Sequence, residues 1–291
     1  MPAKPPPPPP PAPPPPPAEL TIHLALYPSI LQRHSDAKGP NNDGQTLAHL
    51  DHWARHTLPH QILSRIHAQR GLDKDELTTV VKWKMARGKF RPTLLPLVTS
   101  NDDSTVKRIT TSAIDVLSSS SSSSSSSGQD GFAPVQSALD TLCQLKGVGA
   151  ATASAILALL FPDRLAFLSD ELVDVVMHEK PKYTLPYYAK VWTRLTQLQA
   201  QDRDEDGDGD QRRQQWSLSD YELAAWALAV SRKLDAAPAG KRKGPADEQQ
   251  FSKRAKEDPA PRPKIEAAPT AAGVGPRRSS RTTASSASKL K

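Results

Sequence analysis

Two segments with helical periodicity meet at the turn Gly147-Val148-Gly149, and this pattern constrains the fold more than any other part of the chain. Leu142 and Leu145 share a face before the turn. After the turn, the apolar side chains at helical spacing are those of Ala153, Ile156, Leu157 and Leu160. Gly147 stands where a helix end favours a positive φ. The pattern predicts two helices, at 134–145 and 150–160, that pack as a hairpin.

The start of the second predicted helix is a candidate anion site. Its first N–H groups have no acceptor within the helix, and they lie at the positive end of the helix dipole. Gly149 has no Cβ, so a ligand can approach the backbone closely there. We therefore expect this turn to accept a phosphate group.

The stretch from Leu142 to Leu157 resembles the helix-hairpin-helix motif of DNA repair proteins, because the apolar, Gly, Val, Gly and Thr-Ala positions coincide. The resemblance implies that the hairpin binds the sugar–phosphate backbone of duplex DNA. The DNA-binding residues that it implies here are Lys146, Gly147, Val148, Gly149 and Thr152. The alternative is a glycine turn between two core helices that contacts no ligand.

Low-complexity segments limit the part of the chain that can bury a core. Residues 1–18 are mostly proline, 118–127 are serines, 201–215 are acidic and polar, and 235–291 are rich in Lys, Arg, Pro, Ala and Ser. We expect a disordered proline-rich head at 1–18, a linker without assigned structure at 19–44, and a disordered basic tail at 235–291. Between them we expect one helical domain at 45–234, with disordered inserts at 118–131 and 201–215.

Helical periodicity covers this domain, and alternating strand patterns are scarce. The expected helices are 45–58, 59–69, 73–87, 92–98, 103–117, 134–145, 150–160, 170–178, 185–199 and 220–234. Asp73 with Glu76, and Ser219 with Glu222, have the spacing of capping boxes. The fold class that follows is all-α, a helical domain between disordered N- and C-terminal tails.

The segment that follows the hairpin, residues 161–172, adds a second point of resemblance. In the helix-hairpin-helix DNA glycosylases, a short loop follows the second hairpin helix, and an aspartate then opens the next helix. Asp170 stands at that place, with one extra residue in the loop. The resemblance implies that Asp170 is catalytic, because a carboxylate stabilises the cationic sugar formed as a glycosidic bond breaks, or activates the attacking water. The alternative is that Asp170 or Ser169 only caps the helix 170–178.

The same resemblance indicates which type of glycosylase chemistry to expect. Bifunctional members carry a lysine just after the hairpin, which attacks the sugar and forms a Schiff base. The matching residue here is Ala151, which has no nucleophile. Any glycosylase activity is therefore expected to be monofunctional, with water as the nucleophile and no cofactor.

A second cluster combines cations with aromatic side chains at 82–91. Its cations are Lys82, Lys84, Arg87, Lys89 and Arg91, and its aromatic residues are Trp83 and Phe90. Cations bind phosphates and an aromatic ring stacks on an exposed base, so the cluster is a candidate DNA-binding surface. The alternative is a solvated helix end with both aromatic rings packed inward. Together with the hairpin and the segment around Asp170, the cluster resembles the eukaryotic Amun-like branch of the superfamily, which implies a nuclear, glycosylase-like protein.

The formal net charge of +7 is concentrated in the tail, where 13 Lys and Arg face 6 Asp and Glu. Two basic groups in this tail resemble a bipartite nuclear import signal; they are Lys241, Arg242 and Lys243, and Lys253, Arg254 and Lys256. The alternative is a polybasic tail that attracts polyanions without sequence preference. We expect a nuclear location and an import receptor as a partner.

Other features narrow the class of protein. The single Cys143 excludes an intrachain disulfide and a four-cysteine cluster. No apolar run is long enough to span a membrane, and the N-terminus lacks the apolar core of a signal peptide, so we expect a soluble intracellular protein. The histidines of 49–60 and the acidic residues of 202–213 suggest metal sites, but Pro59 interrupts the first group and Arg213 replaces the required ligand in the second. No metal is therefore expected.

These patterns predict a nuclear protein that binds duplex DNA through a glycosylase-like helical domain and that acts as a monofunctional DNA glycosylase in base excision repair. Two rivals remain. One is a catalytically inactive DNA-binding module of the same fold. The other is an interaction scaffold whose proline-rich head recruits proteins with proline-binding domains.

Overall fold

The computed structural model describes residues 17–66, 69, 71–120, 129–204 and 216–236. In this part of the chain the regular elements are helices, so the expected all-α class is confirmed. The proline-rich head, most of the poly-serine and acidic inserts, and the six nuclear import residues from Lys241 to Lys256 lie outside the described residues.

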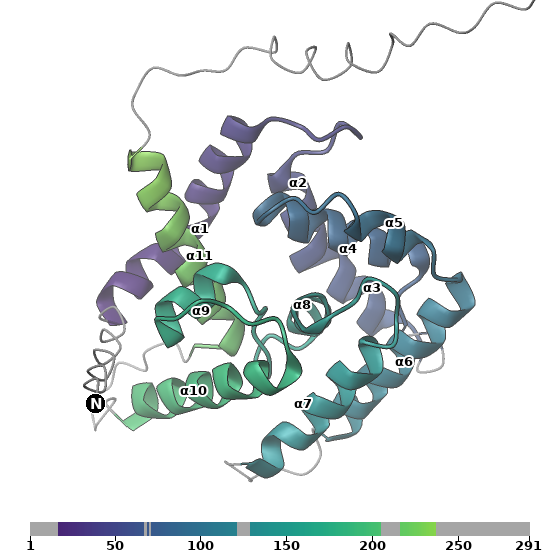
Figure 1. Cartoon of the computed structure of the whole chain (residues 1–291). Coiled ribbons are helices and arrows are strands. Elements are labelled where there is room, and N and C mark those ends of the chain that lie inside the picture. Colours follow the sequence, from purple (N-terminus) through teal and green to yellow (C-terminus); the bar gives the residue numbers. More distant parts are fainter. Residues whose placement is uncertain (1–16, 67–68, 70, 121–128, 205–215, 237–291) are drawn as a thin grey trace, which may run out of the picture. The chain divides into compact units, whose positions relative to one another are not determined.

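Figure 1 shows the order and arrangement of the helices. Their bounds are α1 Pro17–Lys38, α2 Leu47–His52, the π-helical turn η1 Trp53–Thr57, α3 Leu58–Ser64, α4 Lys74–Arg87, α5 Leu94–Thr99, α6 Asp103–Ser119, α7 Gln129–Leu142, α8 Ala150–Leu160, α9 Asp170–Met177, α10 Leu185–Asp204 and α11 Leu218–Ala236. The expected helices from 73 onward are present, with ends shifted by a few residues. The expected break at Pro59 is wrong, because α2, η1 and α3 follow one another without a gap and Pro59 lies in the first turn of α3.

α8 is the central helix. All of its residues, from Ala150 to Leu160, are buried, and it contacts α3, α4 and α7. Most of its side chains are alanines and leucines, and small side chains let neighbouring helices approach closely. This packing fixes the start of α8, and therefore the turn in front of it, against the rest of the core.

α1 occupies a segment for which the sequence indicated no structure. It packs along α11, and its apolar side chains Leu20, Tyr27, Ile30 and Leu31 are buried. The proline-rich run directly before it and Pro28 within it are both signals against a helix, because proline lacks the N–H that a helix interior uses. The burial of one face against α11 outweighs this local cost.

Two capping predictions have different outcomes. The capping box of Asp73 and Glu76 at the start of α4 is confirmed in both directions. The box predicted for Ser219 and Glu222 is wrong, because Ser217 exchanges these hydrogen bonds with Asp220. Glu222 is buried in the core instead.

The part of the chain that the structure describes gives two further observations. It contains no helix that is both long enough and apolar enough to cross a membrane. It also contains no group of three or more His, Cys, Asp or Glu side chains placed to hold a metal ion. The rings of His52 and His56 lie 5.0 Å apart between centroids, as neighbours on one helical face.

Candidate functional site

Gly147 is required by the geometry of the turn between α7 and α8. Its φ is +77°, and a Cβ at this position would lie 2.8 Å from Cγ2 of Val98. The side chain of Asn101 bonds both backbone polar groups of Lys146, the residue before Gly147. The N–H of Lys146 donates to Oδ1 of Asn101 at 2.9 Å, and Nδ2 of Asn101 donates to the carbonyl of Lys146 at 3.0 Å. Glycine is therefore the residue that suits this position, and Asn101 fixes the backbone immediately before it.

Gly149 has no such structural requirement. Its φ of −106° suits any residue, and a Cβ built on it meets nothing within 4 Å. It is exposed, and within the described chain the amides of Gly149, Ala150 and Ala151 have no hydrogen-bond acceptor. Open space above free amides at a helix N-terminus is the arrangement that admits an anion close to the backbone.

Two of the five hairpin residues predicted to contact DNA are buried. Val148 is 5% exposed, and its N–H donates to the carbonyl of Leu145. Thr152 is 3% exposed, and its N–H donates to the carbonyl of Gly149. Their side chains therefore offer little surface to a ligand, and Lys146 and Gly149 are the exposed members of the set.

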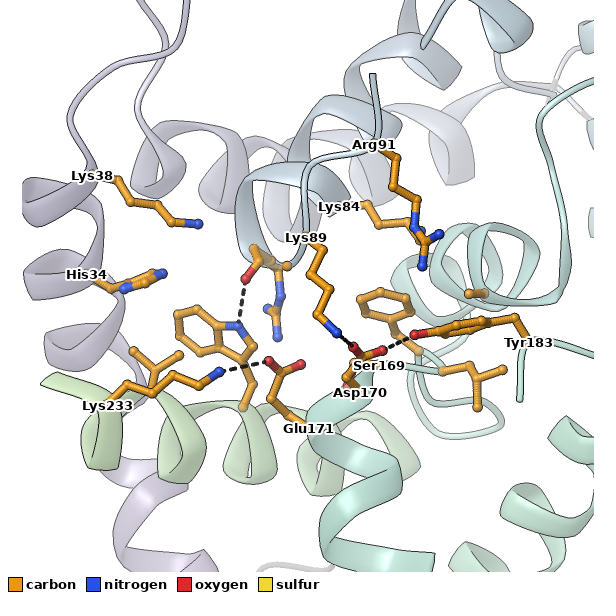
Figure 2. A pocket seen from close by; sticks show the side chains of 17 residues that line it. His34, Lys38, Lys84, Lys89, Arg91, Ser169, Asp170, Glu171, Tyr183 and Lys233 are labelled. Atoms are coloured by element: carbon orange, nitrogen blue, oxygen red, sulfur yellow. Dashed lines mark hydrogen bonds and ion pairs between the residues drawn. The ribbon is translucent and has the colours of Figure 1, made fainter. Parts of the chain in front are cut away.

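A cavity of about 200 Å³ lies beside the hairpin. Ala151 from the first turn of α8 and Asp170 from the first turn of α9 both line it. The other walls come from α1, from the end of α4 and the segment after it, from the segment just before α9, from the connection between α9 and α10, and from α11. Figure 2 shows how side chains from these separate parts of the sequence converge.

Asp170 is held by two partners at the cavity. Its Oδ1 accepts a hydrogen bond from the hydroxyl of Tyr183, and its Oδ2 lies 3.1 Å from Nζ of Lys89 (Figure 2). The carboxylate is not needed as the cap of α9, because Oγ of Ser169 accepts from the N–H of Leu172 at 3.2 Å. Partial burial alone would raise the pKa of Asp170, but Tyr183 and Lys89 stabilise the ionised form and the net effect is a lowered pKa.

The lining of the cavity is predominantly cationic, with six Lys or Arg side chains against Asp170 and Glu171. Figure 2 shows Lys84, Lys89 and Arg91 grouped near Asp170, and Lys38, His34 and Lys233 at the other end near Glu171. Burial lowers the pKa of Lys84, and the neighbouring Arg91 lowers it further. Cations that crowd one another around a cavity favour the entry of an anion.

The predicted 82–91 cluster divides into three parts. Lys84, Lys89 and Arg91 line the cavity. Lys82 does not line it, and its Nζ lies 2.7 Å from Oδ2 of Asp43. Arg87 also belongs to the lining, but its side chain is buried, which does not favour the predicted contact with DNA.

Arg87 is engaged in the core. Its side chain is 1% exposed, and its Nη2 donates to Oε1 of Glu222 at 2.8 Å. Its Nη1 donates to the hydroxyl of Tyr27 at 2.8 Å, and its carbonyl accepts from Nε1 of Trp226. Arg87 also lines the cavity, but its charge is already paired with buried carboxylates and is not available to a ligand.

The two aromatic rings of the cluster have different surroundings. Trp83 is buried, as the solvated-helix alternative predicted, and its Nε1 donates to Asp51 at 2.8 Å. Phe90 is 74% exposed, so the same alternative is wrong for that ring.

Several site residues were missed by the sequence analysis. His34 and Lys38 lie on α1, which had no predicted structure, and Lys233 lies near the end of α11, where no motif marks it. Tyr183 lies between α9 and α10, where no local pattern marks it. The fold brings the connection between α9 and α10 back to the start of α9, and this places the hydroxyl of Tyr183 against Asp170.

No family model, no curated protein and no solved structure matches this chain. The chemistry of the site therefore follows from its geometry. A cavity of about 150 Å³ is enough to accommodate benzene, so a volume of about 200 Å³ admits a planar ring of similar or slightly larger size. An ionised carboxylate beside that space can stabilise a developing positive charge.

Proposed function

We propose that this chain binds duplex DNA and accepts one nucleotide into the cavity, where Asp170 assists cleavage of the N-glycosidic bond. The observation that carries the proposal is the position of Asp170, an ionised carboxylate in a cation-lined cavity that also contains the first turn of α8. The turn in front of α8 offers free amides and an open Gly149 to a backbone phosphate.

The chemistry assigns separate roles to the side chains. As the base leaves with the electron pair of the glycosidic bond, positive charge develops on the sugar, and the carboxylate of Asp170 stabilises it. Water then attacks C1′ and loses a proton to solvent. Ala151 supplies no amine to this reaction, which favours the monofunctional form of the activity.

The cations serve in binding. In this proposal, phosphates near the extruded nucleotide are bound by Lys146 at the turn and by three cations that line the cavity, Lys84, Lys89 and Arg91. A nuclear location fits a DNA-binding protein, and the basic residues of the tail that suggest it belong to the same proposal.

One observation favours a second candidate function, a DNA-binding module without catalysis. Both oxygens of Asp170 are engaged, by Tyr183 and by Lys89. If Lys89 stays on the carboxylate when DNA binds, the charge of Asp170 is already neutralised and contributes little to the sugar cation.

The test uses the full chain and a panel of duplexes that each carry one damaged base. The proposal predicts alkali-sensitive abasic sites on at least one duplex, and their loss in Asp170→Asn with unchanged affinity. Normal binding without any abasic product supports the second candidate.

The contribution of the turn is tested separately. Gly149→Ala and Gly149→Val place side chains of increasing size in open space, so we expect an unchanged melting temperature and a stepwise loss of duplex affinity. The basic tail binds DNA in both variants and in the wild type, so affinities are compared across a salt series. Equal affinity in all three proteins would show that the turn is structural.

A further inference from the structure

A second group of basic side chains lines the cavity at the end away from Asp170. His34 and Lys38 come from α1 and Lys233 comes from α11 (Figure 2). We call these three residues the α1–α11 cluster. The proposed cleavage of a glycosidic bond uses none of them, so their presence at the cavity needs a separate explanation.

The ring of His34 is held in place but makes no hydrogen bond. It lies edge-on to the buried indole of Trp226, with 5.7 Å between the ring centroids and 78° between the ring planes. Within the residues that the structure describes, neither ring nitrogen has a hydrogen-bond partner. Burial and the positive charges nearby, first that of Lys38, lower the pKa of His34 to about 4, so at pH 7 the ring is neutral and has one N–H to donate.

The two lysines carry more positive charge than their neighbours neutralise. Nζ of Lys38 donates to the carbonyl of Ala86 at 2.6 Å, an acceptor without a full charge. Nζ of Lys233 lies 3.6 Å from Oε1 of Glu171, which is the carboxylate that lines this end of the cavity. Each ammonium group has three N–H donors, so both keep donors for a ligand.

The lysines also disfavour each other. Burial lowers the pKa of Lys38, and the charge of Lys233 lowers it further. The side chain of Lys233 is 70% exposed, so a ligand can reach this end of the cavity from solvent. Like charges that converge on an accessible space from two helices attract an anion, because the anion relieves their repulsion.

The number of donors narrows the choice of anion. A phosphate monoester carries about two negative charges at pH 7 and has three free acceptor oxygens. The two ammonium groups and the imidazole N–H of the α1–α11 cluster offer three donor groups to these oxygens. A phosphodiester within a nucleic acid strand carries one negative charge and has two free oxygens, so it matches the cluster less well.

We propose that the α1–α11 cluster is a binding site for a phosphate monoester, which is supplied by a free nucleotide or by the phosphorylated end of a DNA strand. The ammonium groups of Lys38 and Lys233 pair with its charged oxygens, and the ring N–H of His34 donates to it. The site is distinct from the cations that serve the proposed duplex binding, and it requires no cleavage by Asp170.

The first experiment titrates the full chain with inorganic phosphate and follows the ring signals of His34 by NMR, assigned by their loss in His34→Gln. A saturable shift is expected in the wild type. Lys38→Met and Lys233→Met each remove one charged donor, so each is expected to weaken phosphate binding by about tenfold. The basic tail is the same in all these proteins and does not affect the comparison.

Arg232→Met is the matched control, because Arg232 is the cation next to Lys233 on α11, pairs with Glu19 and does not line the cavity. It is expected to bind phosphate as the wild type does. The melting temperatures of the lysine variants should not fall, because neither ammonium group is paired with a buried carboxylate in the core. The absence of a saturable shift at His34, or equal phosphate affinity in the wild type and both lysine variants, would overturn the proposal.

The second experiment distinguishes the two sources of the phosphate. Duplexes with a 5′- or 3′-terminal phosphate are compared with the same duplexes ending in hydroxyl groups, and a deoxynucleoside monophosphate is compared with its nucleoside. Tighter binding of a phosphorylated duplex that is lost in Lys38→Met assigns the site to strand ends. A preference confined to the mononucleotide assigns it to free nucleotides, and no preference in any pair contradicts the proposal. Abasic-site formation on internal lesions is independent of all these results, so the proposed function stands or fails separately.

Discussion

Arg87 and Glu222 form an ion pair in the core, with 2.8 Å between Nη2 and Oε1, and it joins α4 to α11. Asp51 lies 3.4 Å from Nη1 of Arg87, and Arg55 pairs with both carboxylates, so two positive and two negative charges share the site. The structure thus uses one cation of the 82–91 segment, Arg87, to hold the wall of the cavity in place.

We predict that Arg87→Met lowers the free energy of unfolding by about 3–5 kcal/mol, because it leaves the two buried carboxylates of Asp51 and Glu222 to share the single positive charge of Arg55. Urea denaturation at pH 7 measures the change. The control is Arg232→Met, which removes an exposed pair with Glu19 at 2.9 Å and should cost at most about 1 kcal/mol. Similar losses in both variants would contradict the structural role of Arg87.

The sequence was sufficient for the features that depend on neighbouring residues. The helices around Gly147, the capping box at Asp73 and the start of α9 all follow from spacing over a few positions. The place of Asp170 at a candidate site was implied by the resemblance of this segment to a known motif, whereas its partners were not predicted.

The features of the fold and of the site that were not predicted depend on contacts between segments that are distant in the sequence. A single sequence shows that Arg87 is charged, but not that Glu222 lies beside it 135 positions later. α1 was missed because local proline signals opposed it, whereas its burial against α11 is a tertiary effect. The partnership of Tyr183 with Asp170 escaped for the same reason.

A second prediction concerns Lys84. Burial lowers its pKa, which means that the folded state disfavours its charged form. Lys84→Met removes this cost and keeps the aliphatic stem, so we expect the protein to be more stable by about 1 kcal/mol. The same change should weaken duplex binding and reduce the log–log salt slope by about one, since one phosphate contact is lost.

Thermal denaturation and salt-dependent titration measure the two effects of Lys84→Met. Lys107→Met is the control, because Lys107 is exposed on α6 and paired with Asp103. An unchanged salt slope in Lys84→Met would place Lys84 outside the DNA contact.

The third prediction is a pH dependence that originates at His34. Burial, and then the positive charges of Lys38, Lys233 and Arg87, lower its pKa to about 4 from 6.5. Below pH 6.5 the unfolded chain takes up a proton that the folded chain does not, so the free energy of unfolding falls as the pH drops from 6.5 toward 4. Because the ring is half-buried, we expect a contribution of about 1 kcal/mol.

Urea denaturation at pH 7.5 and at pH 5 measures this effect. His34→Gln keeps a polar side chain that does not titrate, so its loss of stability on acidification should be smaller than that of the wild type. Parallel curves for the two proteins would assign the pH dependence to other groups.

The last prediction tests how Tyr183 controls Asp170. Partial burial opposes ionisation of the carboxyl group, and the hydrogen bond from the Tyr183 hydroxyl is the first of the interactions that overcome it and lower the pKa. Tyr183→Phe removes this donor while the ring remains for Arg91, so the pKa of Asp170 should rise. A carboxyl group with a lowered pKa stabilises the fold above its unfolded pKa, and this contribution is lost as the pH falls through the folded value. The variant should therefore lose less stability on acidification than the wild type.

Carboxyl-carbon NMR titration measures the pKa of Asp170 directly, with Tyr187→Phe as the control because Tyr187 does not line the cavity. A titration of Asp170 that is identical in Tyr183→Phe and wild type would show that the cations Lys89 and Arg91 keep the carboxylate ionised without the tyrosine.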